Sequence, residues 1–395
     1  MFSSSPTASA VADDSSSAEA RTFGILSTFP PTECGIATFS AALANGIITN
    51  GGAVDVVRCG ATPALEDASV LGTLDKSDID RTAPVDVLNR TDVAIVQHEY
   101  GIYDGPDGEE IIEILRDVEV PMIVVAHTVV TSPSANQKRV LEQVCEAADQ
   151  VVVMTETACD RLIGGFDVDG SKIVVIPHGA ATPPADPSPT ADDVWPRSPR
   201  LLTWGLLGPG KGIEWAIDAV AELADLRPRP DYIIAGATHP KVVATSGESY
   251  RQMLVERAAA SSAADSISFD DTYRDLPALT ELIRSADLVV LPYDSTDQVT
   301  SGVLVDAVAA GLPVVSTAFP HAVELLSSGA GLVVPQGDPG DLAAAIRSVL
   351  TDPDLAASMA AEARRLAPDL SWTAVARRYD DLASRLVTNS RAVRQ

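Results

Sequence analysis

The chain contains few cysteines, few histidines and little positive charge. Its 395 residues include 4 cysteines and 5 histidines, and 28 Lys and Arg residues stand against 55 Asp and Glu, which gives a formal net charge of -27. No cysteine pair has CxxC or metal-ligand spacing, so neither a disulfide framework nor a zinc site is indicated. The excess negative charge repels phosphate backbones and anionic lipid, so we expect no nucleic-acid partner.

Long apolar runs are also missing. No stretch approaches the roughly 18 consecutive apolar residues of a membrane helix, and the N-terminal sequence MFSSSPTASAVADDSSSAEA lacks the charged-then-apolar pattern of a secretion signal. We therefore expect no integral membrane segment, a cytoplasmic location and a disordered tail over residues 1–20. The oligomeric state does not follow from the sequence.

One pattern of alternating elements occurs twice in the chain. Strand-like runs such as VAIVQ, MIVVA and KIVVIP alternate with helix-like segments over residues 21–182, and the pattern resumes over residues 200–370 with RLLTW, DYIIAG and DLVVLPY. A segment rich in Pro, Asp and Ser separates the two halves at residues 183–199, as a linker would. The pattern predicts two doubly wound α/β domains with parallel sheets, followed by an amphipathic helix over residues 371–395.

Each of the five histidines follows one of the strand-like runs. In open parallel sheets ligands bind beyond the carboxyl ends of the strands, so this distribution predicts imidazoles around a cleft. Three of them, with the glutamate after the first, are candidate cleft residues: His98, Glu99, His127 and His178. A structural role is favoured for His239 and His321. For each histidine taken singly, helix capping or a backbone hydrogen bond remains an open alternative.

Two glycine turns are candidate phosphate sites. The loop GLLGPGKG at 205–212 follows the strand RLLTW and opens a helix, so the amides near Gly210 and the charge of Lys211 could hold a phosphate. Gly212 stands where a Walker A loop needs Ser or Thr for magnesium, and the spacing is not GxGxxG. In the first domain Gly35, within ECGIATF, either admits a ligand close to the backbone or serves the turn alone.

The stretch QVTSGVLVDAVAAG at 298–311 predicts a helix that starts at a ligand. Ser301 is the expected N-cap and Gly302 the first helical residue. The amides of Thr300, Ser301 and Gly302 would then hold a diphosphate, Asp306 would accept hydrogen bonds from ribose hydroxyls, and Gln298 would reach the sugar. The alternative is an ordinary crossover helix whose aspartate faces solvent.

Taken together, these motifs resemble retaining glycosyltransferases of family 4. The resemblance rests on ECGIATF, VVAHT, VIPHG, GPGKGIEWAI and LPYDSTDQVTSGVLVDAVAAGLPVVSTAFPHAVELLSSGAGLVVPQGD, and it covers nearly the whole chain after the tail. It implies the GT-B fold, in which two Rossmann-like domains face each other across a cleft. It further implies a nucleotide-sugar donor bound mainly to the second domain, a carbohydrate or small-molecule acceptor bound mainly to the first, and no metal or other cofactor. The final helix would cross back to the first domain.

The resemblance also implies roles for single residues. His127 would contact the donor sugar near the reacting carbon, Lys211 the diphosphate and Asp306 the ribose. The chain departs from the family in two places: two glutamates are usual where Gln298 and Asp306 stand, and an arginine is usual where Leu206 stands. Diphosphate stabilisation would then rest on Lys211 and helix amides, with Arg274 or Arg284 as candidate replacements.

The function expected from these residues is glycosyl transfer from a nucleotide-sugar donor to an acceptor hydroxyl, with retention and without metal. Lys211, His127 and Gln298 are the expected catalytic residues. Two alternatives remain open: a GT-B epimerase, hydrolase or phosphorylase, and a catalytically weak sugar-nucleotide-binding protein, which the residues Gln298 and Leu206 would favour. The donor base, the sugar and the acceptor do not follow from the sequence.

Overall fold

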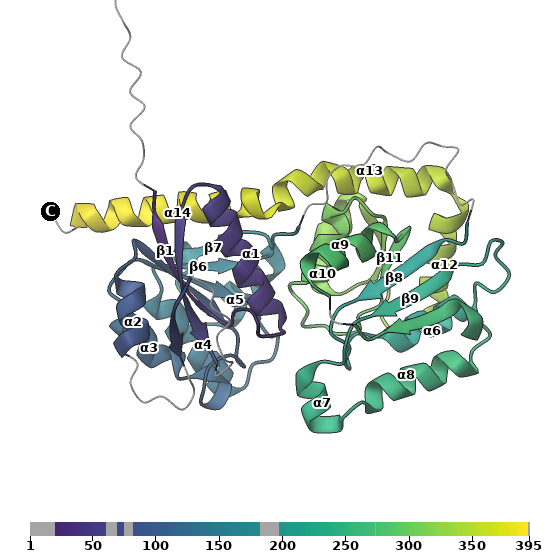
Figure 1. The fold of residues 1–395 in the computed structure, drawn as a ribbon, viewed down its shortest axis with the longest axis horizontal. Coiled ribbons are helices and arrows are strands. Elements are labelled where there is room, and N and C mark those ends of the chain that lie inside the picture. Colours follow the sequence, from purple (N-terminus) through teal and green to yellow (C-terminus); the bar gives the residue numbers. More distant parts are fainter. Residues whose placement is uncertain (1–19, 61–68, 75–81, 182–196, 273, 394–395) are drawn as a thin grey trace, which may run out of the picture.

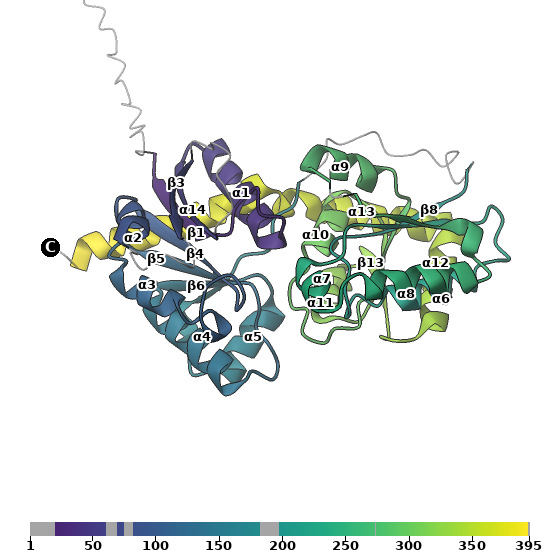
Figure 2. The ribbon, with the colours of Figure 1, turned by 60° about the horizontal axis from the view of Figure 1, so that its bottom comes forward.

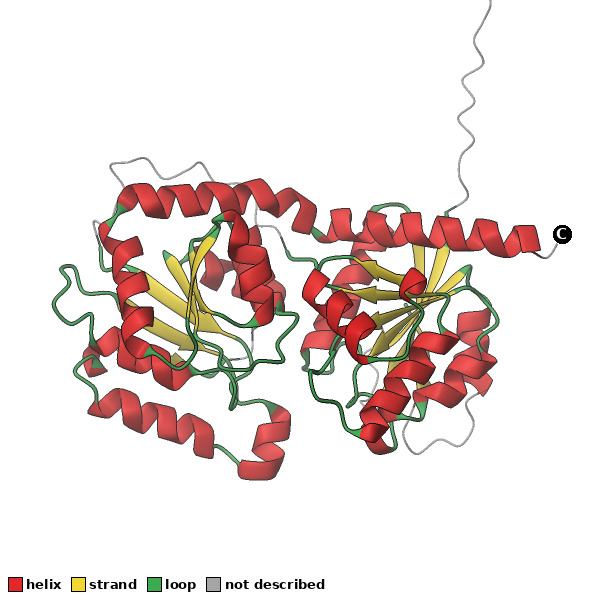
Figure 3. Ribbon diagram, turned by 180° about the vertical axis from the view of Figure 1, so that it is seen from behind, coloured by secondary structure: helices red, strands yellow, loops and turns green. Residues whose placement is uncertain are grey.

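The computed structural model describes residues 20–60, 69–74, 82–181, 197–272 and 274–393. Most of the expected tail (1–20) and of the expected linker (183–199) lies outside the described residues. The described chain forms two parallel sheets, each with helices on both faces (Figure 1, Figure 3). The two Rossmann-like, doubly wound domains predicted from the sequence pattern are therefore present.

The first sheet has seven strands in the order β3-β2-β1-β4-β5-β6-β7. Its strands are β1 Thr22–Ser27, β2 Ala53–Cys59, β3 Val70–Leu74, β4 Val93–His98, β5 Met122–Ala126, β6 Gln150–Val153 and β7 Ile173–Val175. Its helices are α1 Gly35–Thr49, α2 Thr82–Asn89, α3 Ile111–Asp117, α4 Ala135–Ala147 and α5 Glu156–Gly165, with 3₁₀ turns η1 Pro106–Gly108 and η2 Gly170–Lys172.

The second sheet has six strands in the order β10-β9-β8-β11-β12-β13. Its strands are β8 Arg200–Trp204, β9 Asp231–Ala235, β10 Ile267–Asp270, β11 Leu288–Leu291, β12 Val314–Thr317 and β13 Gly331–Val334. Its helices are α6 Ile213–Ala221, α7 Pro240–Ser246, α8 Ser249–Ala260, α9 Leu276–Arg284, α10 Gly302–Ala309, α11 Pro320–Leu325, α12 Pro339–Thr351 and α13 Pro353–Leu370, with 3₁₀ turns η4 Ala264–Ser266 and η5 Leu326–Ser328. The last helix, α14 Trp372–Val393, follows α13 and packs on the first domain.

Burial on both faces explains why the strands are continuous apolar runs. All six residues of β4 are buried; Val93 and Ile95 pack on the side of α1 and α14, and Ala94 and Val96 on the opposite side. Successive strand residues point to opposite faces, so a strand covered on both sides needs apolar residues at every position. In both sheets the chain order reverses beside the first strand, which places the ligand crevice of such folds at the carboxyl ends there.

The last two helices run along both domains. Helix α13 lies on the second domain and α14 lies beside α1 on the first (Figure 1, Figure 2). Gly46 permits the close approach of α1 and α14, because a Cβ added there would lie 2.7 Å from the carbonyl oxygen of Trp372. Of the helices described, none combines the length and apolarity needed to cross a membrane.

Candidate active site

Loops from the carboxyl ends of both sheets meet between the domains. The hydroxyl of Thr155, after β6, donates to the carbonyl of Val299, which lies between β11 and α10. The ring of His178, after β7, lies against Gly302 at the start of α10, where an added Cβ would be 3.0 Å from the imidazole Cε1 and Nε2 atoms. Residues that the sequence pattern placed at the cleft are thus brought together from both domains.

Helix α10 begins as the sequence predicts, with Ser301 as its N-cap and Gly302 as its first residue. The Ser301 hydroxyl accepts from the amide of Leu304 at 3.3 Å, and the Ser301 amide donates to Nδ1 of the buried His321 at 2.8 Å. His321 therefore has the structural role favoured from the sequence. It also occupies one of the amides expected to hold a diphosphate, which leaves those of Thr300 and Gly302 as candidates.

Gln298 makes two hydrogen bonds within the segment around the start of α10. Its side-chain amide donates to the carbonyl of Thr300 at 2.5 Å, and its own carbonyl accepts from the His321 amide at 3.4 Å. A glutamate at this position has no proton to donate to a carbonyl at neutral pH, so glutamine suits this loop geometry. The expected contact of Gln298 with a sugar remains a prediction.

His127 is held by a buried glutamine that sequence reasoning did not single out. Its Nε2 lies 2.7 Å from Oε1 of Gln97, a residue with no exposed surface. Burial, together with the nearby His178 and His98, lowers the pKa of His127 to about 3, so the ring is neutral at physiological pH. Only the position of Gln97 at the end of a strand, directly before His98, could have drawn attention to it.

One aromatic ring, Phe39 of α1, is shared by the two cleft histidines. It meets His127 edge-on with ring centroids 4.9 Å apart and His178 at 5.1 Å, and it meets Trp372 of α14 at 4.9 Å. Nδ1 of His178 lies 2.5 Å from the carbonyl of Gly179, and burial lowers the pKa of His178 to about 4. Phe39 of α1 thus contacts both imidazoles, and Trp372 of α14 contacts that of His178.

The remaining two candidate cleft residues, His98 and Glu99, differ in solvent exposure. His98 is only 1% exposed, meets the Tyr100 ring edge-on, and has a pKa lowered to about 4 by burial. It is a core residue, and the sequence pattern does not reveal this because the last residue of a strand can point to either face. Glu99 is half-buried; it accepts from the Thr128 hydroxyl at 2.5 Å and from the Tyr100 amide at 2.9 Å.

Lys211 lies in a tight glycine loop beside β11. Its Nζ stands over the Tyr293 ring at 4.1 Å from the centroid, and no carboxylate in the described chain pairs with it. Gly210 and Gly212 have φ of 91° and 58°. A Cβ at Gly212 would lie 1.9 Å from the carbonyl oxygen of Pro292, so only glycine permits this turn into α6.

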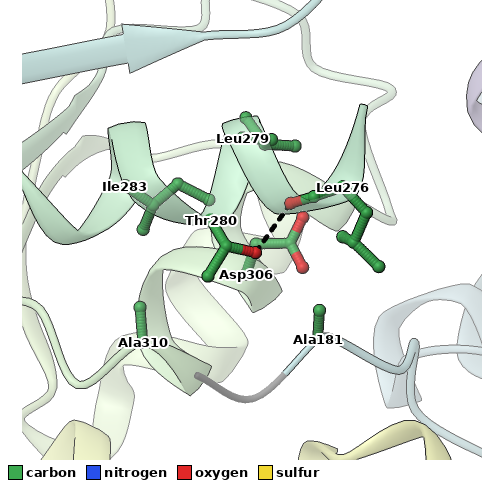
Figure 4. A pocket seen from close by; sticks show the side chains of 7 residues that line it. All are labelled: Ala181, Leu276, Leu279, Thr280, Ile283, Asp306 and Ala310. Atoms are coloured by element: carbon green, nitrogen blue, oxygen red, sulfur yellow. Dashed lines mark hydrogen bonds between the residues drawn. The ribbon is translucent and has the colours of Figure 1, made fainter. Parts of the chain in front are cut away.

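The carboxylate of Asp306 does not point into solvent. Figure 4 shows it beneath α9 in a pocket whose other lining residues are Ala181, Leu276, Leu279, Thr280, Ile283 and Ala310. Burial raises the pKa of Asp306 to about 7, and a hydrogen bond from the backbone N–H of Ala181 opposes this shift. Asp306 is half-buried in this pocket, and its contact with ribose remains a prediction.

Gly35 is the first residue of α1 and meets no packing demand. A Cβ added there would have no neighbour within 4 Å, and its φ is not in the left-handed region. The turn alone therefore does not require glycine at this position. The prediction that Gly35 lets a ligand approach the backbone therefore stays open. A glycine needed only for the turn does not explain this residue.

Cations near the site differ from those expected. Arg274 pairs with Asp270, whose pKa it holds down to about 2, so this arginine is used locally. Lys241 of α7 reaches the first domain, because a Cβ added at Gly101 would lie 2.2 Å from its Nζ. Arg251 donates to the Thr238 hydroxyl at 3.3 Å beside the Lys211 loop. The position of Lys241 against Gly101 depends on the docking of segments that are distant in sequence, which no local spacing encodes.

Among the residues that the structure describes, no group of three or more His, Cys, Asp or Glu is arranged to hold a metal ion.

The second domain matches the family model described as glycosyl transferases group 1, over residues 194–366. Curated relatives include the D-inositol 3-phosphate glycosyltransferase of Corynebacterium efficiens, 28% identical over 298 residues that cover 70% of this chain and 68% of the relative. The protein of the same name from Geodermatophilus obscurus is 31% identical over 312 residues, 70% of this chain and 65% of the relative. The aligned regions thus span about two thirds of these relatives.

Solved structures share the two-domain fold. Anabaena Alr3699/HepE in complex with UDP superposes with a TM-score of 0.71 at 17% identity, over 93% of this chain and 100% of that chain. WaaG, a glycosyltransferase involved in lipopolysaccharide biosynthesis, has a TM-score of 0.60 at 16% identity, over 92% of this chain and 99% of that chain. Two Rossmann-like domains with facing strand ends define the GT-B fold, which confirms the predicted fold class.

The second domain thus matches the group 1 glycosyl transferases, and the described chain has the fold of solved GT-B glycosyltransferases. The resemblance carried by the sequence motifs is thereby confirmed at this level.

Proposed function

We propose that this chain transfers a sugar from a nucleotide-sugar donor to an acceptor hydroxyl, with retention at the anomeric carbon and without a metal ion. The observation that carries the proposal is the contact between His178 of the first domain and Gly302 at the start of α10 in the second. It brings imidazoles to the amino end of a helix, where a diphosphate is favoured by amides and by the helix dipole.

The donor diphosphate is proposed to lie between Lys211 and the amino end of α10. Lys211 has no carboxylate partner in the described chain, so its charge is available to an anion. A cation and a helix dipole offset leaving-group charge as a metal would, which supports metal independence. One structural neighbour was solved with UDP-glucose, so uridine donors are the first to test.

In the proposed reaction the bond between the anomeric carbon and the diphosphate oxygen breaks, and its electron pair leaves with the diphosphate. The acceptor oxygen bonds to the anomeric carbon on the same face, and its proton passes to the departing diphosphate. Since the pKa of His127 is lowered to about 3, the ring serves as a neutral hydrogen-bonding group to the sugar and does not deliver a proton. Retention is supported by the motif resemblance to the retaining family.

A phosphorylated polyol is the proposed acceptor class. Curated relatives are named for D-inositol 3-phosphate. In this chain Lys241 reaches Gly101, two residues after Glu99, and pairs with no carboxylate in the described residues. A lysine ammonium is a compact charge suited to a phosphate group, and it would offset the repulsion of an acidic protein.

A second candidate is a protein that binds sugar nucleotides and turns them over weakly. Gln298 favours it, because its amide is engaged by Thr300 and it carries no negative charge to support a positive anomeric centre.

Product analysis separates these functions. Purified protein is incubated with UDP-glucose and other nucleoside diphosphate sugars, with and without inositol phosphates, in EDTA. The proposal predicts an α-linked product from an α-linked donor only when acceptor is present. Free sugar without acceptor would indicate a hydrolase, and bound nucleotide without turnover would indicate the binding protein. Activity that EDTA abolishes and Mn²⁺ restores would contradict metal independence.

A further inference from the structure

The loop that carries Gln298 belongs to the second domain, yet the first domain holds it. Val299 is 2% exposed, and its side chain packs within the hydrophobic core cluster of the first domain. The Thr155 hydroxyl donates to the Val299 carbonyl at 3.1 Å. Gln298 therefore sits directly beside a residue that is buried in the opposite domain.

Two further residues of the same loop are bound from the first domain. The amide of Thr131 donates to Oδ1 of Asp297 at 3.1 Å, and the Thr131 hydroxyl donates to the same oxygen. Arg161 donates to the Thr296 carbonyl at 2.9 Å and lies 3.6 Å from Asp297. Three of the four residues from 296 to 299 thus contact the first domain, while the Gln298 side chain turns to Thr300.

A second contact between the domains involves α11, the next helix in the chain after α10. Glu324 of α11 accepts from the amides of Glu156 and Thr157, at 2.9 and 3.0 Å, and from the Thr157 hydroxyl at 2.8 Å. These amides open α5, so a carboxylate from the second domain caps a helix of the first. Thr155 joins the two anchors, because its oxygen also accepts from the Ala158 amide of α5 at 3.0 Å.

We propose that this interdomain seam, made of Thr131, Thr155, Thr157 and Arg161 on one side and of residues 296–299 and Glu324 on the other, positions Gln298 for the donor. Thr155 and Glu324 are its positioning residues. Separation of the domains removes Val299 from its core and releases the loop, so the site is complete only in the docked arrangement. The inference rests on the proposed function, since it uses the donor sugar as the partner of Gln298.

The amino end of α10 is fixed within the second domain through Ser301 and His321. Loss of the seam should therefore disturb the sugar more than the diphosphate. Turnover should therefore fall while the affinity for the free nucleoside diphosphate is kept. A merely structural role would lower both quantities together.

The test uses Thr155→Val and Glu324→Gln in the full chain, with Thr155→Ser as the rescue variant. Asp338→Asn is the matched control, because the Asp338 side chain caps α12 through the amides of Gly340 and Asp341 and bonds to no seam residue in the described chain. We expect kcat to fall about 10- to 100-fold in the two seam variants, with Kd for UDP within about twofold of wild type. Thr155→Ser and Asp338→Asn should keep wild-type turnover.

Hydrogen exchange gives a second readout that does not need activity. Amides of residues 296–300 should exchange at least about tenfold faster in Thr155→Val and Glu324→Gln than in wild type and Asp338→Asn. Wild-type exchange of this loop in both seam variants would overturn the proposal, as would equal kcat losses in Asp338→Asn. If the wild type shows no turnover, the proposed function fails while the exchange result still decides whether the seam holds the loop.

Discussion

At the scale of single residues, burial sets the charge state of the site. The pKa values of His98 and His178 are lowered to about 4 and those of His127 and His321 to about 3, with desolvation as the largest cause. Water no longer solvates the imidazolium form, so the neutral ring is favoured. At physiological pH these four histidines therefore do not act as cations for phosphate. Three of them, His127, His178 and His321, make hydrogen bonds, and His98 acts through packing.

The same shifts predict acid sensitivity. An unfolded histidine titrates near 6.5, so between this pH and about 4 the unfolded chain binds more protons than the folded one, and stability is lost as pH falls. Asp306 changes stability with pH in the opposite direction, since its folded pKa of about 7 exceeds its ordinary value of 3.8. It is a single group, whereas four histidines lower stability as pH falls. We expect the melting temperature to fall from pH 7 to pH 5. A flat or rising profile would contradict this.

His98→Phe provides the matched variant for that profile. Neither ring nitrogen of His98 has a hydrogen-bond partner among the described residues, so phenylalanine removes a titrating group without removing a bond. The acid slope should become shallower in His98→Phe than in wild type. An unchanged slope would show that this histidine does not contribute.

Asp306→Asn tests the titration of this carboxyl group, because asparagine has nearly the same shape. The folded state of wild type holds the Asp306 proton up to about pH 7, so the stability gained from this group is lost as pH rises through 7; asparagine does not titrate. Between pH 4 and pH 7 wild type should therefore lose stability relative to the variant in thermal melts, and above pH 8 the difference should stay constant. If Asp306 contacts the ribose, nucleoside diphosphate binding should weaken by about 1–3 kcal/mol. Wild-type affinity would show that the ribose assignment is wrong.

Gln298→Glu tests the uncharged residue. The carboxylate cannot donate to the Thr300 carbonyl, so the loop brace is lost and a negative charge faces a carbonyl oxygen. For an active transferase adapted to glutamine, kcat should fall or the donor preference should change, as steady-state kinetics on a donor panel would reveal. A rate that rises from near background would instead favour the weak binding protein.

At the scale of elements, two glycines that open helices are expected to differ. Gly302→Ala places a methyl group 3.0 Å from the His178 ring, so the first domain must shift and both the melting temperature and kcat should fall. Gly35→Ala meets nothing within 4 Å and gains up to about 1 kcal/mol of helix propensity. Its melting temperature should hold or rise. A loss of turnover there would then report a ligand at Gly35, and full turnover would remove Gly35 from the site.

The local sequence predicts elements well and side-chain direction less well. Apolar runs identify the buried strands, and Ser301 and Gly302 mark the start of α10, because periodicity and capping are local properties. The burial of His98 and the direction of Asp306 towards α9 depend on neighbours that are distant in sequence. Glu324 and Lys241 could not be predicted, because each meets its partner only once the domains are docked.

At the scale of the molecule, the two domains are linked in several places. The seam joins α5 to the loop before α10, and the amide of Ala180 donates to the Leu370 carbonyl at 2.8 Å where α13 ends. Trp372 then packs against Phe39 and His178, so the helix that returns to the first domain also supports the cleft. An acidic chain thereby presents Lys211 and Lys241 at a site expected to take anions.

The central claim is that Lys211 and the amino end of α10 hold the diphosphate of a nucleotide sugar. Titration calorimetry of UDP, GDP and ADP in EDTA tests it on wild type, Lys211→Ala and Lys241→Ala, the last as a control in the same domain but on the acceptor side. We predict that at least one nucleoside diphosphate binds wild type and Lys241→Ala alike and binds Lys211→Ala at least about tenfold more weakly, since a charged contact is lost. Equal binding to all three proteins, or no binding of any nucleoside diphosphate to wild type, would contradict the account.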